Sequence, residues 1–225
     1  MYRKIENLKE VLENHLTYLE TGDLSKHADL SGVDLSGMDL TNVDLSYADL
    51  SGANLSGTDL RETQLNGALL NDADLSGANL NFANMEGGFL NGAKLNGAKL
   101  NFVNLRAASL NDADLSYTKL NNTDLSGANM KGAKLSFALF KGACLRGADL
   151  NGALLDHTDL SFADLRNVDL KDADLSGANL SFTNLSFAYL SCTKLNGAKL
   201  NNAEMSRSYM RDTDLSCAEG LNGKK

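Results

Sequence analysis

Three His and three Cys are the residues of this chain best suited to nucleophilic, acid–base or metal chemistry. They are His15, His27, His157, Cys144, Cys192 and Cys217. Their positions share none of the short spacings typical of metal ligands. A nucleophilic triad needs a His next to its Ser, and the many Ser and Asp of this chain recur regularly without one. The sequence therefore predicts no catalytic site, no metal site and no cofactor.

These residues belong to a chain that follows one five-residue frame without interruption. From Leu30 to Leu215 every fifth residue is large and apolar, which makes 38 such positions. The only departures from Leu are Met85, Met130, Phe140, Met205 and Met210. A helix repeats every 3.6 residues or so and a strand every two, so neither matches a period of five. The chain must therefore turn within each repeat.

Gly recurs two residues after the large apolar position, as at Gly32, Gly52 and Gly57, where a tight turn needs a positive φ. Each repeat then consists of three extended residues and a corner. Alternate residues of an extended segment share a side, so the large position and the small residue two before it point inward. With about a right angle at each corner, four repeats close a square coil, and the stacked coils form a rod roughly 45 Å long.

The repeated unit Ala-(Asp/Asn)-Leu-Ser-Gly, as in residues 73–77, resembles the pentapeptide-repeat proteins. The resemblance extends over residues 28–215. It implies an all-β solenoid, a right-handed quadrilateral β-helix, to which this chain adds an N-terminal α-helical cap. It implies little about function, because most members of the family have no assigned role.

We expect three segments along the chain. Residues 1–22 form a helix whose apolar residues lie three and four apart and are Ile5, Leu8, Leu12, Leu16 and Leu19. The simplest role of this helix is to cover the open end of the first coil. A helix that binds a partner or anchors the chain to a membrane is the alternative. Residues 23–219 form the β-helix, and residues 220–225 form a short C-terminal tail.

The net charge of −8 agrees with a soluble solenoid that does not bind nucleic acid directly. The sequence contains no apolar run long enough to cross a membrane, and its N-terminus lacks the apolar run of a secretory signal. The three Cys are too scattered for a disulfide framework, which favours a reducing compartment. We therefore expect a cytoplasmic protein.

The four faces of the coil are numbered by their inward residues: the first face carries Leu30, the second Leu35, the third Leu40 and the fourth Leu45, with every twentieth residue after each. Large residues replace the corner Gly along the third face and the neighbouring second face. They are Phe82, Phe102, Tyr117, Phe137, His157, Phe162 and Phe182. Residues twenty positions apart should stack in adjacent coils. Such ladders either only stabilise the stack or form a docking surface for a protein partner.

The large corner residues also lead to an expectation about the backbone. A bulky residue is strained at positive φ. We therefore expect type II turns with positive φ at the Gly corners only. Phe82, Phe102, Phe162 and Phe182 should adopt a different turn.

Acidic residues outnumber basic ones on the first face. Its acids are Asp29, Asp49, Asp72, Asp112, Asp149, Asp169, Asp172 and Asp212, against Lys131, Lys171 and Arg211. Carboxylates repeated along a rod can imitate a row of DNA phosphates, and the resemblance includes members that resemble a DNA duplex and bind gyrase or topoisomerase IV, protecting against quinolones. Two features weaken this alternative: Lys and Arg interrupt the acidic ladders, and no loop breaks the five-residue frame as it does in several topoisomerase-protecting members. The second face instead alternates charge, with Asp74, Lys94, Asp114 and Lys134 in successive coils.

We therefore expect a non-enzymatic structural or protein-interaction solenoid whose protein partner is unknown, with a DNA-mimicking topoisomerase interactor as the alternative. The five-residue frame ends before Gly220, so the last coil should expose strand edges. Such an edge favours a two-fold, end-to-end contact. One rod cross-section is smaller than the roughly 1,000 Å² of a stable interface, so we expect a monomer or a weak end-to-end dimer.

Overall fold

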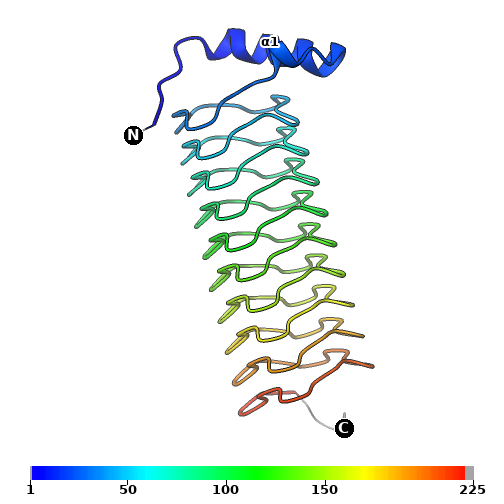
Figure 1. Ribbon diagram of the computed structural model, residues 1–225. Coiled ribbons are helices and arrows are strands. Elements are labelled where there is room, and N and C mark those ends of the chain that lie inside the picture. Colours follow the sequence, from blue (N-terminus) through cyan, green and yellow to red (C-terminus); the bar gives the residue numbers. More distant parts are fainter. Residues whose placement is uncertain (1, 221–225) are drawn as a thin grey trace.

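The computed structural model describes residues 2–220 and is a straight stack of square coils with one helix across its N-terminal end (Figure 1). The helix is α1 (Leu8–Thr21), and the short 3-10 helix η1 (Leu24–Lys26) leads from it into the first coil. From there the chain descends coil by coil to the opposite end of the rod (Figure 1). The expected solenoid with an N-terminal helix is confirmed.

Adjacent coils are joined by parallel backbone pairing at a constant offset of 20 residues. The first such pair on the first face is Asp29 with Asp49, and the last pair of the stack is Lys199 with Glu219. Leu30 N donates to Asp49 O at 2.7 Å, and Asp49 N donates to Ala28 O at 3.0 Å. Each extended segment is so short that it forms a single bridge. The offset of 20 residues confirms that four repeats close one coil.

Every corner is a β-turn that also takes part in the stack. At the first corner Val33 N donates to Leu30 O at 3.2 Å, which closes the turn, and Gly32 N donates to Ser51 O of the next coil at 2.9 Å. Almost every backbone N–H is therefore used by the fold. This accounts for the complete absence of Pro, which has no N–H to donate.

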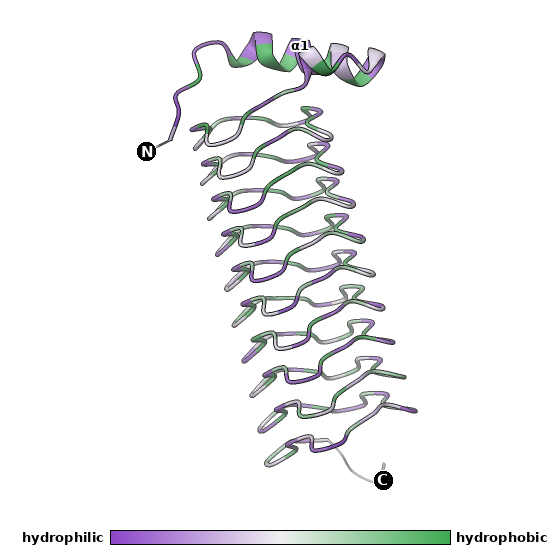
Figure 2. Cartoon of the chain, viewed as in Figure 1, coloured by the Kyte–Doolittle hydropathy of each residue, from purple (hydrophilic) through white to green (hydrophobic). Residues whose placement is uncertain are grey.

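The interior of the rod is a continuous apolar column. The inward Leu and Ala side chains from Ala28 to Ala203 are at most 4% exposed, and Phe140 is fully buried among them. Inward Thr residues satisfy their hydroxyl groups on backbone carbonyls, as Thr58 does on Leu35 O at 2.9 Å. Figure 2 shows the resulting alternation of apolar and polar segments along every coil. The interior therefore leaves no room for a substrate.

The capping helix is shorter than the sequence predicted. The prediction started the helix at residue 1, but α1 begins at Leu8. Arg3 instead pairs with Val33, donating its N–H to Gly32 O at 2.7 Å and accepting from Asp34 N at 2.9 Å. The free edge of the first coil offers backbone groups that an extended segment can satisfy and a helix cannot.

The helix buries a slightly different face from the one expected. Leu8, Val11 and Leu12 of α1 pack against the end of the core, together with Ile5, which precedes the helix. Leu16 was expected on this face but is 48% exposed. In the next turn of α1 the residue that faces the coil is instead His15, which is fully buried. No helix in residues 2–220 is long and apolar enough to span a bilayer.

The far end of the rod is less well covered. Met205, Met210 and Leu215 are only partly buried where they pack against the last coils. Of the tail expected at 220–225, only Gly220 belongs to the described residues, and residues 221–225 lie outside them.

Candidate functional site

The predicted aromatic ladders are present. The rings of Phe82 and Phe102 stack at 5.1 Å between centroids, and those of Phe162 and Phe182 at 4.9 Å. In the third ladder Tyr117, Phe137 and His157 stack at 5.2 and 5.0 Å. The rings are within 12° of parallel. The six Phe and Tyr side chains are 44–64% exposed, so the ladders form raised ridges on the rod.

The prediction of two turn classes is wrong. Every corner from Gly32 to Cys217 has a positive φ, including 22 corners that are not Gly. Phe82 has φ 64° and Phe162 has φ 62°. The reason is the stack, because each corner N–H must donate to the coil below, as Phe82 N does to Asn101 O at 3.1 Å. A left-handed residue costs about 1–2 kcal/mol, and the hydrogen bonds and ring stacking offset that cost.

Several corner side chains lean toward the C-terminal end of the rod and lie close to the corner residue of the next coil. Where the next corner is aromatic, a ladder forms. At some corners a Gly makes room for the preceding side chain: a Cβ at Gly177 would lie 3.2 Å from the His157 ring, where one ladder ends, and one at Gly67 would lie 2.6 Å from Tyr47 Cδ1. Gly67 and Gly177 are therefore constrained by a neighbour as well as by their φ.

The ladders lie along the two edges of the third face. The corner that opens this face carries Tyr117, Phe137 and His157. The corner that closes it carries Phe82 and Phe102 and, further along, Phe162 and Phe182. The ladder of Tyr117, Phe137 and His157 stands opposite the gap between the two Phe pairs, where the closing corner holds Asn122 and Gly142. The three ladders thus border one face in a staggered arrangement.

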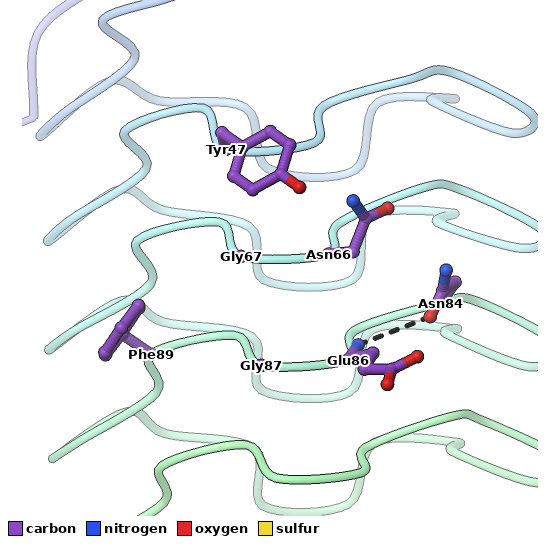
Figure 3. Close-up of a pocket in the computed structure, with 7 residues that line it drawn as sticks. All are labelled: Tyr47, Asn66, Gly67, Asn84, Glu86, Gly87 and Phe89. Carbon is purple, nitrogen blue, oxygen red and sulfur yellow. Dashed lines mark hydrogen bonds between the residues drawn. The ribbon is translucent and has the colours of Figure 1, made fainter.

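Three further aromatic features were not predicted. Tyr189 and Tyr209 stack at 5.1 Å on the first face, and their spacing of twenty residues was the signal that could have revealed them. Arg207 lies over the Phe187 ring at 5.6 Å. Tyr47 covers Gly67 at the edge of a surface hollow (Figure 3).

The hollow lies between the fourth and first faces, at their shared edge. Figure 3 shows Tyr47 above two Gly corners, with Phe89 two coils below it. The residues that line the hollow are Tyr47, Asn66, Gly67, Asn84, Glu86, Gly87 and Phe89. Asn84 Oδ1 accepts from Glu86 N at 3.3 Å, so this amide supports its own turn. The hollow is a gap in the corner side chains, since the interior beneath it is filled, and it does not exclude water as an enclosed active site does.

The acidic first face is divided and partly neutralised. Asp29 lies opposite Asp49 in the next coil, and Asp149 lies opposite Asp169, through parallel backbone bridges. The outward positions between these two pairs are Leu69, Phe89, Ser109 and Asn129. Asp72, Asp112, Asp172 and Asp212 occupy corners with φ near 57°. A basic nitrogen lies within 4.0 Å of four of the eight carboxylates, those of Asp29, Asp149, Asp172 and Asp212.

Many outward Asp residues have a structural role at the turn that follows them. Asp29 Oδ1 accepts from both the backbone N and the Oγ of Ser31, at 3.0 and 2.6 Å. The Ser31 hydroxyl and then its N–H hold the pKa of Asp29 below its ordinary value. Ser36 lowers the pKa of Asp34 in the same way. Part of the negative charge is therefore a consequence of how the repeat closes its turns.

The residues first considered for chemistry are not gathered at a site. His15 lies on the buried side of the capping helix, while the three Cys are free and lie on different coils. His15 and His27 approach each other at 5.8 Å between ring centroids. Across residues 2–220 no group of three or more His, Cys, Asp and Glu is placed to hold a metal ion.

Comparison with known proteins identifies the repeat. The family described as Pentapeptide repeats matches in several overlapping segments, at residues 26–57, 53–92, 73–112, 108–147, 143–181 and 178–216. The chain belongs to the pentapeptide-repeat family. A search of curated proteins found no significant match to this pentapeptide-repeat protein.

Solved structures of two relatives are similar to this pentapeptide-repeat protein. HetL, a protein of the cyanobacterium Nostoc sp. strain PCC 7120 involved in heterocyst differentiation regulation, is 32% identical, with 92% of this chain and 96% of HetL covered and a TM-score of 0.49. A trypsin-treated variant of QnrB1, a plasmid-mediated fluoroquinolone resistance protein, is 19% identical, with 82% of this chain and 91% of that protein covered and a TM-score of 0.61. The likeness to QnrB1 concerns the fold alone.

Proposed function

We propose that this pentapeptide-repeat protein is a non-enzymatic solenoid that binds a protein partner through its third face. The observation that carries the proposal is the set of half-exposed aromatic ladders on both edges of that face. Tyr and Phe are enriched at the centres of protein interfaces, where rigid rings bury large areas at low entropic cost. An exposed apolar surface of this extent is unusual on a protein that has no partner.

The absence of catalysis is part of the same proposal. The interior is filled by Leu and Ala, and the outward Ser and Asp largely support turns. The family is generally non-enzymatic, and its member HetL is described by its regulatory involvement. Three free, scattered cysteines support a reducing, cytoplasmic location, and the small far end supports a monomer or a weak end-to-end dimer.

The test is capture of a partner followed by titration of the purified pair. The tagged chain is incubated with cytosolic extract of its source cells, and the retained protein is purified and titrated against the wild-type chain and two variants. Phe137→Ser removes the centre of a ladder on the third face. Tyr189→Ser removes a ring of similar exposure on the first face and is the matched control.

We expect Phe137→Ser to weaken binding at least about tenfold, as truncation of a buried interface anchor does, and Tyr189→Ser to leave binding unchanged. Circular dichroism melts establish that both variants remain folded. Equal binding by all three proteins, or retention of no protein at all, would contradict the proposal.

A further inference from the structure

The floor of the third face contains an acid-free strip between the aromatic ridges. Its outward residues in successive coils are Asn79, Lys99, Lys119 and Leu139. Asp59 lies on the coil before this strip, and Asp159 on the coil after it. The strip therefore carries only positive charge, although the protein as a whole has a net charge of −8.

The two lysines of the strip are direct cross-strand neighbours. Lys99 pairs with Lys119 through the backbone, and in the part of the chain that the structure describes no ion pair involves either one. Like charges placed opposite each other destabilise a sheet. The second face avoids this cost, because Lys94 lies there between Asp74 and Asp114. The third face keeps a repulsion that the neighbouring face has removed.

The Asn residues at the closing corner of the floor are hydrogen-bonded to one another. Asn81, Asn101 and Asn121 form an amide ladder in which each Nδ2 donates to the preceding Oδ1, at 3.1 and 3.0 Å. Lys141 N donates to Asn121 Oδ1 at 3.1 Å, which ends the ladder. The ammonium groups of Lys99 and Lys119 are charged donors that no ion pair among the described residues occupies.

The ridges reinforce this positive character. Stacked rings hide their electron-rich faces against one another and turn their edges, where the ring hydrogens carry positive charge, toward solvent. The Lys141 ammonium lies over the Phe162 ring at 5.7 Å and occupies one ring face that is not stacked. Ring edges and ammonium groups attract carboxylates together.

The shape of the strip suits a peptide segment. The three-residue strand between two corners is about 10 Å long, which is wide enough for an extended chain or one face of a helix. Leu139, 39% exposed, lies at the end of the lysine pair and beside Phe137. Its exposed side chain provides an apolar contact surface next to the two charged groups.

We propose that the third face between Lys99 and Lys141 binds an acidic segment of a partner protein, with carboxylates on Lys99 and Lys119 and an aliphatic side chain on Leu139. This inference rests on the proposed function of the third face as a protein-binding surface. A protein segment is favoured over a nucleic acid because the ring faces needed for base stacking are hidden in the ladders. The net charge of −8 would also repel a phosphate backbone.

The probe is a fluorescein-labelled peptide of four Glu-Glu-Leu repeats, titrated by fluorescence anisotropy at low and at high salt. Lys99→Gln/Lys119→Gln removes the stacked lysines. Lys94→Gln/Lys134→Gln on the second face changes the net charge equally and is the matched control. We expect binding to the wild type that weakens as salt is raised, a loss of about tenfold or more with the third-face variant, and no loss with the control.

Three outcomes would overturn the inference: no binding of the peptide to the wild type, equal loss in both variants, or binding of a labelled oligothymidine strand in preference to the peptide. If the captured partner loses affinity for Phe137→Ser but not for Lys99→Gln/Lys119→Gln, only the proposal that the bound segment is acidic would be overturned. That result would leave the proposed protein-binding function standing.

Discussion

The backbone N–H of Ala28 donates a hydrogen bond to Nδ1 of His15 at 3.1 Å. The other ring nitrogen, Nε2, lies 3.1 Å from Ser46 O. Since Nδ1 must keep its lone pair to accept from Ala28, the single proton of the ring is on Nε2 and is donated to Ser46. This neutral, buried imidazole joins α1 to both ends of the first coil, and its two backbone partners would be orphaned without it.

The attachment of the cap should depend on pH. Burial lowers the pKa of His15 from 6.5, nearby His27 lowers it further, and Ser46 and Asp44 act in the opposite direction. Because the pKa is lower in the folded state, the unfolded cap binds more protons in acid. The cap therefore has its full stability above the ordinary His pKa and loses it as the pH falls below that value. Tyr18 stacks on His15 at 5.5 Å between ring centroids.

Hydrogen exchange of α1 at about pH 7.5 and about pH 5, corrected for intrinsic rates, checks this prediction. Protection of α1 should fall in acid while the central coils stay protected. His27→Gln serves as a control that keeps His15. Equal protection of α1 at the two pH values would show that His15 does not control the cap.

Gly67 should tolerate Ala less well than Gly57 does. Both have positive φ, at 64° and 65°, so both variants incur the left-handed cost of about 1 kcal/mol. Only at Gly67 would the new Cβ also meet the Tyr47 ring. Chemical denaturation should show a larger loss for Gly67→Ala, and Tyr47→Ala should abolish the difference. Equal losses for the two Gly variants would mean that the ring moves aside freely.

Substitution by Gly at two non-Gly corners should change the free energy of unfolding in opposite directions. Ala107 has φ 53° and only a methyl group to lose, so Ala107→Gly should raise the free energy of unfolding by about 1 kcal/mol. Phe102→Gly relieves the same strain but removes the stack on Phe82. This variant should therefore lower the free energy of unfolding. Thermal melts of the two variants test whether ring stacking compensates for the backbone conformation. A gain in stability for Phe102→Gly would refute that compensation.

We expect no inhibition of DNA supercoiling by purified gyrase at about 1 μM of the protein. The acidic first face is interrupted by Leu69 and Phe89, and Lys131 lies 3.0 Å from Asp149, so no continuous row of carboxylates imitates a DNA strand. Inhibition that disappeared with Asp149→Asn/Asp169→Asn would establish the DNA-mimic alternative instead.

The sequence by itself determined the coil, its core and the position of every ladder. A period of five with an inward Leu specifies which side chains are buried. The coil of four repeats that the family resemblance implies then brings Phe82 next to Phe102. These features follow from the repeat because each coil contacts only its neighbours. The same rule, applied to Tyr189 and Tyr209, would have found their stack.

The tertiary structure alone decided the conformation of the Phe corners, the role of His15 and the pairing of Arg3. Local sterics predicted that Phe82 would avoid positive φ, but its N–H is required by a carbonyl of the next coil, and that demand is not visible in the local sequence. His15 and Arg3 likewise satisfy backbone groups at the open end of the stack. The repeat specifies its own interior, whereas an end is completed by whichever nearby residue can reach its unpaired backbone groups.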